Sequence, residues 1–165
     1  MAGEHTFDVV SNVNLQELRN AIAQAQKEIA TRFDFRGSSA SLQFDEADKS
    51  VKITADHQAQ LRSVIDVLET KLAKRGVSVK VLAWAAEESL PSGGMKRSAS
   101  LQQGLSSEKA KEIVKTIKDL GLKVQPRIDG DAVRVAGKQL DELQVVIQAI
   151  RGKDFGVPLQ FENYR

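Results

Sequence analysis

The pattern of apolar and polar positions predicts the same order of elements in both halves of the chain. In the first half the spacing predicts a strand (7–11), a helix (14–29), a hairpin of two strands (40–45 and 50–54), a second helix (61–72) and a last strand (77–83). In the second half it predicts a strand (98–102), a helix (106–120), a hairpin of two strands (123–128 and 132–136), a second helix (143–150) and a last strand (159–164). This succession indicates two similar βαββαβ halves.

Local signals support the repeat. Asn14 stands where a helix N-cap is favoured, and Asp129-Gly130 is a strong signal for a tight turn between two strands. The residues that follow Val51 (Lys-Ile-Thr-Ala-Asp) parallel those that follow Val133 (Arg-Val-Ala-Gly-Lys). The expected fold class is therefore α+β, with an antiparallel sheet in each half and both helices on one face. The other face of each sheet is expected either to bind a partner or to be covered by the other half.

The expected domain organisation follows from the composition between the halves. Pro91, Gly93 and Gly94 lie close together and are typical of a linker. We therefore expect a first half at residues 1–86, a linker at residues 87–97 and a second half at residues 98–165.

Composition and charge exclude some classes of function. Lys and Arg total 24 against 22 Asp and Glu, and the resulting net charge of +2 is too small to indicate nucleic-acid binding by itself. The chain has no cysteine, which excludes disulfides and thiolate nucleophiles and fits a reducing compartment. No apolar run is long enough for a membrane span, so we expect no membrane partner and a cytoplasmic location.

Motifs for catalysis are missing from the sequence. Neither a G-x-x-x-x-G-K-[ST] phosphate loop nor a G-x-G-x-x-G dinucleotide fingerprint occurs. The two histidines, His5 and His57, have no partner at a spacing that suits a metal site or a general base. We therefore expect a protein that is not an enzyme, with no catalytic residue, no metal site and no cofactor.

Residues 31–37 are the most unusual segment, because two phenylalanines and two arginines lie close together in it. If the segment is extended, Phe33 and Phe35 point to one side, with Arg32 and Arg36 on the other. Phenylalanine rings stack on bases and guanidinium groups bind phosphates, so these four residues are the first candidates for nucleotide contacts. The alternative is that the rings pack into the core while the arginines pair with Asp34 and its neighbours.

Other basic residues are secondary candidates. Lys96 and Arg97 stand near the glycine pair of the linker, which either wraps a phosphate with its N–H groups or is simply solvated. Arg127 and Arg134 lie on the second hairpin, where they mark either a cationic or a merely solvated sheet face. The last residue, Arg165, is basic as well.

A common RNA-binding fold has the same succession of elements, but its signature is absent. Such modules carry aromatic residues on their third strand, where bases stack. The third strands expected in this chain, residues 50–54 and 132–136, contain no aromatic residue. Base stacking of that kind is therefore disfavoured, and any nucleic-acid binding must use another surface.

Four segments carry a resemblance to a known family. They read Phe-Asp-Val-Val-Ser, Lys-Glu-Ile-Ala-Thr-Arg-Phe-Asp-Phe-Arg-Gly, Lys-Leu-Ala-Lys-Arg-Gly and Leu-Gln-Phe-Glu-Asn-Tyr-Arg, at residues 7–11, 27–37, 71–76 and 159–165. Together they closely resemble the bacterial YajQ family, and the resemblance extends over essentially the whole chain. It implies two tandem ferredoxin-like (RNP-like) subdomains and allows an exchange of strands between the halves. Residues 89–96 depart from the family's pattern, which argues against a phosphate contact by the linker.

The resemblance also implies a function. YajQ-like proteins are described as nucleotide-binding, some members are implicated as cyclic di-GMP effectors that cooperate with a transcription regulator, and RNA binding has been suggested. The family supplies no catalytic residues and no ligand motif that can be placed residue by residue. The leading hypothesis is a non-catalytic protein that binds a purine nucleotide (cyclic di-GMP, GTP or ATP). The alternatives are an RNA-binding or ribosome-associated protein, and a protein-interaction adaptor with an apolar patch on a sheet face and no small ligand.

Overall fold

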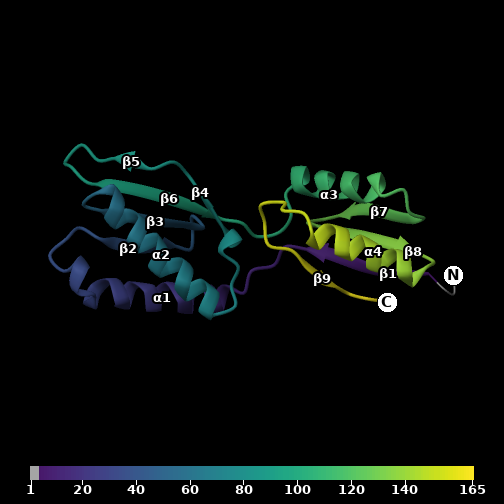
Figure 1. Cartoon of the computed structure of the whole chain (residues 1–165), viewed down its shortest axis with the longest axis horizontal. Helices are drawn as coiled ribbons and strands as arrows, with labels where there is room; N and C mark the ends of the chain where they lie inside the picture. The colour runs from purple at the N-terminus through teal and green to yellow at the C-terminus, as the bar shows by residue number, and fades with distance from the viewer. Residues whose placement is uncertain (1–3) are drawn as a thin grey trace. The chain divides into compact units, whose positions relative to one another are not determined.

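The computed structural model describes residues 4–165 and divides them into two compact units. One unit, Val13–Gln102, is continuous in sequence and is called the inserted unit. The other consists of residues 4–12 together with Gln103–Arg165 and is called the split unit. Each unit contains an antiparallel sheet with two helices on one of its faces (Figure 1). The expected α+β fold, with two ferredoxin-like subdomains, is confirmed.

The inserted unit begins with a helix and ends with a central strand of its sheet. Its elements are α1 (Leu15–Thr31), the 3₁₀ helix η1 (Phe33–Phe35), β2 (Ser41–Asp45), β3 (Ser50–Ala55), α2 (Gln58–Lys74), the 3₁₀ helix η2 (Val79–Val81), β4 (Leu82–Trp84), β5 (Glu88–Ser89) and β6 (Met95–Leu101). The strand order is β2-β3-β6-β4, and β5 pairs with β6. Val51, Ile53 and Ala99 are buried in the core between this sheet and its helices.

The split unit takes its first strand from the beginning of the chain and the rest from the C-terminal part. Its elements are β1 (His5–Val10), α3 (Ser107–Asp119), β7 (Val124–Asp129), β8 (Ala132–Gly137), α4 (Leu140–Arg151) and β9 (Gln160–Glu162). The strand order is β7-β8-β1-β9, so β1 pairs with both β8 and β9. Phe7, Val133 and Ile147 are buried in the core of this unit.

These units group the strands differently from the expected halves, residues 1–86 and 98–165. The first strand, β1, pairs with β8 and β9 rather than with the strands that follow it in the sequence. Met95–Leu101, expected to contain the end of a linker and the start of the second half, forms β6 and pairs with β3. The apolar pattern identifies strands, but it does not state which sheet a strand joins. Residues 1–3, which the expected first half includes, lie outside the described residues.

The two sheets are nevertheless built alike. In the split unit β1 lies between β8 and β9, and in the inserted unit β6 lies between β3 and β4. Both of these strands run antiparallel to their two neighbours. The last strand of the inserted unit thus takes the position that the first strand of the chain takes in the split unit.

The helices have defined caps and buried apolar stripes. Asn14 caps α1 as expected, because its side-chain oxygen accepts a hydrogen bond of 3.2 Å from the Glu17 backbone N–H. His57 caps α2, where its Nδ1 accepts a hydrogen bond of 3.2 Å from the Gln60 backbone N–H. Within residues 4–165, no helix is long and apolar enough to cross a membrane.

The face of each sheet that points away from its helices is polar. Side chains alternate along a strand, so the neighbours of buried Val133 and Val135 on β8 project from the open face of the split unit. That face carries Thr6, Asp8, Gln125, Arg127, Arg134 and Glu162. The corresponding face of the inserted unit carries Ser41, Gln43, Lys52, Thr54, Ser98 and Ser100. No aromatic side chain occupies the open face of either sheet among the strands that the structure describes.

Replacing Phe7 by alanine is expected to destabilise the split unit by about 3–5 kcal/mol, because Phe7 is 1% exposed and its loss leaves a cavity beneath the sheet. The matched control is Phe33→Ala in the inserted unit. Phe33 is 85% exposed, so its loss should change the free energy of unfolding by less than about 0.5 kcal/mol. Urea unfolding followed by far-UV circular dichroism measures both effects. Equal losses of stability in the two variants would contradict the assigned core.

Candidate functional site

The open face of the split unit's sheet brings three arginines to one pocket. Arg127 on β7 lies opposite Arg134 on β8, and Arg134 lies opposite Asp8 on β1. Arg165 follows β9 and pairs with Thr6 through two backbone hydrogen bonds of 3.0 and 3.4 Å. The pocket has a volume of about 290 Å³ and is lined by Glu4, Thr6, Arg127, Arg134, Asn163 and Arg165. We call it the arginine pocket.

A bidentate ion pair fixes the central arginine of this pocket. Arg134 Nε donates a hydrogen bond of 2.9 Å to Asp8 Oδ1, and Arg134 Nη2 donates one of 3.3 Å to Asp8 Oδ2. Asp129, at the end of β7, adds a weaker contact, with its Oδ2 3.6 Å from Arg134 Nη1. Because Asp8 is buried, this pair is better shielded from water than a surface salt bridge.

The electrostatics of the pair follow from these contacts. The hydrogen bond from Arg134 is the main cause that lowers the pKa of Asp8 below its ordinary value of 3.8, and the Asn163 amide acts in the same direction. Burial opposes this effect, and the charges of Arg134 and Arg165 reinforce it. The same hydrogen bond raises the pKa of Arg134. Both groups therefore stay charged at neutral pH.

A bulge after β9 brings Asn163 and Arg165 to the pocket. Glu162 pairs with Asp8 but Arg165 pairs with Thr6, so the C-terminal segment accommodates one extra residue at this point. Asn163 has a φ of 57°, a left-handed conformation that asparagine tolerates better than most residues. As a result the Asn163 amide donates a hydrogen bond of 2.8 Å to Asp8 Oδ2. Arg165 lies opposite Thr6, on the open face.

Arg127 and Arg165 are available to a ligand. Their side chains make no ion pair or hydrogen bond with another side chain within residues 4–165. Arg127 also lies directly opposite Arg134, and like charges at such positions are unfavourable unless an anion compensates them. Guanidinium groups bind phosphate and carboxylate oxygens in a bidentate manner. The arginine pocket is therefore suited to an anion with several oxygens.

The loop of residues 31–37, expected to make the main contacts, is not extended. Phe33–Phe35 form the 3₁₀ helix η1, in which Phe33 is exposed whereas Phe35 is 4% exposed and lies in the core. The expectation that both rings point to one side is wrong. A 3₁₀ helix has three residues per turn, so residues two positions apart point in different directions.

The two arginines of this loop differ in their surroundings. Arg32 Nε lies 2.8 Å from an Asp34 carboxylate oxygen, and Arg32 Nη1 lies 3.5 Å from one of Glu28. The Arg32 guanidinium carbon also lies 5.0 Å from the centre of the Phe35 ring. The side chain of Arg36 is exposed and has no comparable partner within residues 4–165. Pairing with Asp34, one of the two alternatives drawn from the sequence, thus holds for Arg32 only.

Lys96 and Arg97 lie on β6 rather than in a linker. Lys96 Nζ is 3.4 Å from a Glu88 carboxylate oxygen. Arg97 Nε donates a hydrogen bond of 2.7 Å to the Ala85 carbonyl, and its guanidinium carbon lies 5.4 Å from the centre of the Trp84 ring. Successive residues of a strand point to opposite faces, so the two cations do not converge on one ligand.

The structure groups three candidates that the sequence could only name separately, Arg127, Arg134 and Arg165. Sequence reasoning missed Asp8 and Asn163, although the orientation of Arg134 depends on them. A signal existed for Asp8, because it is a charged residue between the apolar residues Phe7 and Val9 of a strand. Asn163 gave no such signal, since its left-handed backbone and its bond to Asp8 are visible only in the fold.

The histidines make local contacts. His57 is the cap of α2, and His5 Nδ1 lies 3.1 Å from the Arg165 carbonyl oxygen. Within the described part of the chain, no three His, Asp or Glu side chains are grouped so that they could hold a metal ion.

Comparisons with known proteins identify the family. The family described as "Nucleotide-binding protein YajQ-like" matches residues 5–165. The chain belongs to the YajQ family. A protein of Carboxydothermus hydrogenoformans, named a nucleotide-binding protein, is 48% identical over 100% of both chains. Relatives with the same name from Desulforamulus reducens and Solibacter usitatus are 44% and 45% identical, and each alignment covers at least 98% of both chains.

Asp8→Asn is expected to lower the free energy of unfolding by about 1–3 kcal/mol at neutral pH, because it removes the charged partner of Arg134. The pKa of Asp8 is depressed in the folded state. Its stabilising effect is therefore complete above the unfolded value of 3.8 and is lost as the pH falls through the lower folded value. Thermal unfolding across this range should show the wild-type advantage shrinking in acid.

The control is Asp129→Asn, which removes the more exposed and more distant carboxylate beside the same arginine. We expect it to cost less than about 1 kcal/mol. A deficit of Asp8→Asn that stays constant into the acid range contradicts the assigned ion pair.

Proposed function

We propose that this protein binds a nucleotide through the arginine pocket and does not transform it chemically. The observation that carries the proposal is the convergence of Arg127, Arg134 and Arg165 around about 290 Å³. The relatives that match the whole chain are named nucleotide-binding proteins. Phosphate groups are the part of such a ligand that a cluster of guanidinium groups recognises.

The three arginines have different roles in this proposal. Asp8, itself held by Asn163, orients the Arg134 guanidinium before the ligand arrives, so little conformational freedom is lost on binding. Arg127 and Arg165 supply the positive charge that is not compensated within the protein. A phosphate that lies between Arg127 and Arg134 also relieves the repulsion between these two opposed cations.

Within this proposal the ligand is a purine nucleotide, with cyclic di-GMP as the most specific form and GTP or ATP as alternatives. A cyclic dinucleotide carries two phosphates, which suits a pocket with more than one guanidinium group. Arginine also stacks on the faces of aromatic rings such as purines. The resemblance to a family in which some members act with a transcription regulator supports an effector role for this protein in the cytoplasm.

The alternative functions have less support. An RNA-recognition surface of this topology uses aromatic rings on the open face, and no aromatic side chain lies there among the described strands. An adaptor protein needs an apolar patch, whereas both open faces carry mainly charged, hydroxyl and amide side chains. The loop with Phe33 and Arg36 is the second candidate for the nucleotide site, because both side chains are exposed.

The double variant Arg127→Ala/Arg165→Ala is expected to weaken nucleotide binding by about a hundredfold or more, since each lost bond to a charged group costs roughly 1.5–3 kcal/mol. Isothermal titration calorimetry with cyclic di-GMP, GTP and ATP measures this change. The matched control is Arg32→Ala/Arg36→Ala, which removes two arginines from the loop of the inserted unit. It should bind like the wild-type protein, and both variants should keep their far-UV circular dichroism spectra.

The reverse pattern, with binding lost only in Arg32→Ala/Arg36→Ala, moves the site to that loop. A short RNA should be titrated in parallel at two salt concentrations. RNA affinity that falls steeply with salt, together with no heat from the small nucleotides, would favour the RNA-binding alternative.

A further inference from the structure

Residues 163–165, which follow β9 and are called the strap, form part of the arginine pocket. They supply Asn163 and Arg165, two of the six residues that line it. The proposed function above treats these two side chains as fixed. The contacts of the strap indicate instead that its position depends on the ligand.

Few bonds hold the strap on the sheet. The Arg165 backbone N–H donates a hydrogen bond of 3.0 Å to the Thr6 carbonyl, and the Thr6 N–H donates a longer one of 3.4 Å to the Arg165 carbonyl. His5 Nδ1 lies 3.1 Å from the same Arg165 oxygen, and Asn163 adds its side-chain bond to Asp8. These contacts all join the strap to β1.

The strap also lies at an exposed edge. It continues β9, the last strand in the order β7-β8-β1-β9, so β1 is its only neighbour among the described strands. All three strap residues are exposed. A segment with few buried contacts and exposed backbone bonds opens at a low cost in free energy.

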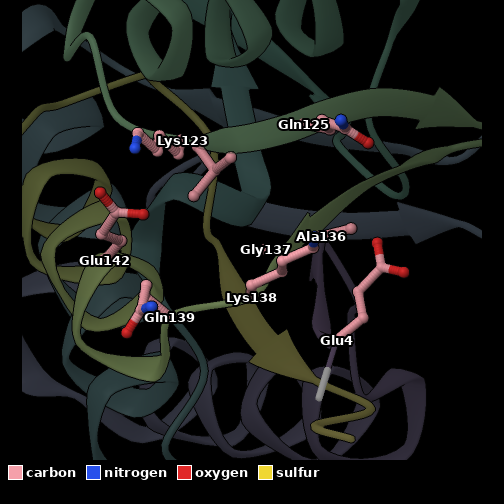
Figure 2. Close-up of a pocket in the computed structure, with 9 residues that line it drawn as sticks. Glu4, Lys123, Gln125, Ala136, Gly137, Lys138, Gln139 and Glu142 are labelled. Carbon is pink, nitrogen blue, oxygen red and sulfur yellow. The ribbon is translucent and has the colours of Figure 1, made fainter. Parts of the chain in front are cut away.

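The end of β1 that holds the strap borders a cavity rather than the core. Glu4 lines the arginine pocket and also a cavity of about 650 Å³ beyond the end of β8. Figure 2 shows Glu4 at one side of this cavity and Glu142 at the other. His5 and Thr6, which bond the strap, are themselves only half-buried. The packing around this end of β1 therefore does not fix the strap rigidly.

Docking of the strap brings a third cation to the pocket. Arg165 then lines the same pocket as Arg127 and Arg134, and its charge helps to lower the pKa of Asp8. Neither Arg127 nor Arg165 forms an ion pair within residues 4–165, and like charges in one pocket repel each other. A phosphate group between them offsets this repulsion, because each guanidinium then interacts with an anion.

Tyr164 holds the strap from the other face of the sheet. Its ring stacks on that of Phe7, with the ring centres 6.2 Å apart and an angle of 28° between the ring planes. Phe7 is buried in the core, whereas Tyr164 does not line the arginine pocket. Tyr164 therefore influences the docking of the strap without touching a ligand in the pocket.

We infer that the strap is a ligand-dependent switch, which docks firmly on β1 when an anionic ligand occupies the arginine pocket and opens more often when the pocket is free. This inference rests on the proposed nucleotide binding. Docking and binding stabilise each other, because linkage between two equilibria is reciprocal. The strap thus converts the presence of the nucleotide into a change at one edge of the sheet, and Tyr164 is a positioning residue for Arg165.

Tyr164→Ala is expected to lower the affinity for the nucleotide by about fivefold or more, the lower end of typical coupling between two sites. Tyr164→Phe keeps the stacked ring and should bind like the wild-type protein. The matched control, Phe33→Ala, removes an exposed aromatic ring from the inserted unit and should also leave the affinity unchanged. Isothermal titration calorimetry with cyclic di-GMP, GTP and ATP measures these affinities, and far-UV circular dichroism checks that each variant is folded.

Hydrogen exchange of the wild-type protein tests the switch without any substitution. Saturation with whichever of these three nucleotides binds most tightly should slow exchange of the Thr6 and Arg165 amides by about fivefold or more, since these amides bond the strap to β1. The amide of Ile53, in a buried part of the inserted unit, is the reference and should not change. Nuclear magnetic resonance resolves these amides one by one.

The outcomes separate this inference from the proposed function. Binding without slower exchange at Thr6 and Arg165, or wild-type affinity in Tyr164→Ala, overturns the switch alone. The arginine pocket then still stands if Arg127→Ala/Arg165→Ala loses the nucleotide. No binding of any of the three nucleotides by the wild-type protein overturns the proposed function, and the switch with it.

Discussion

The pairing of β1 with its two neighbours is the constraint on which the split unit depends. β1 lies between β8 and β9, so without it these two strands share no partner. Its side chains alternate between the two faces of the sheet: Phe7 and Val9 are buried in the core, while Thr6 and Asp8 lie on the open face. A shift of one residue would exchange these two sets. The register that forms the core therefore also places Asp8 opposite Arg134.

The arginine pocket combines one compensated cation with two uncompensated ones. The buried carboxylate of Asp8 loses contact with water, and the hydrogen bonds from Arg134 and Asn163 offset this loss. Neither Arg127 nor Arg165 pairs with a carboxylate within residues 4–165, so the charge of these two guanidinium groups is not compensated by an ion pair. Arg134 therefore stabilises the fold through Asp8, and in the proposed function it also contacts the phosphate together with Arg127 and Arg165.

Much of the fold could be predicted from the sequence because it depends on patterns of residues that are close together in the chain. The cap at Asn14, the apolar stripes of the helices and the turn at Asp129-Gly130 all involve residues that are near one another in the chain. The partners of β1 and β6 could not be predicted in this way. The alternation of apolar and polar residues indicates that a segment is a strand with two different faces. Which sheet the strand joins depends on contacts between segments that are distant in the sequence.

The candidate site shows the same limit. Arg127, Arg134 and Arg165 stood out by residue type, but the bond between Asp8 and Arg134 joins residues that are 126 positions apart. In the loop with Phe33 and Phe35, a dense local cluster of arginines and aromatic rings suggested an extended segment with both rings on one side. The 3₁₀ conformation places Phe35 in the core, where it packs beneath Arg32. Composition alone did not reveal which local geometry the chain adopts.

The position of β1 has a consequence for protein synthesis. The ribosome produces this strand before any strand with which it pairs, and the whole of Val13–Gln102 follows before β8 and β9 emerge. At about 5–20 residues per second this interval lasts several seconds, whereas small domains can fold in much less time. The inserted unit thus has all its strands while β1 still lacks partners, and unpaired strands are prone to associate with other chains. The duration of that exposure is set by the rate of translation.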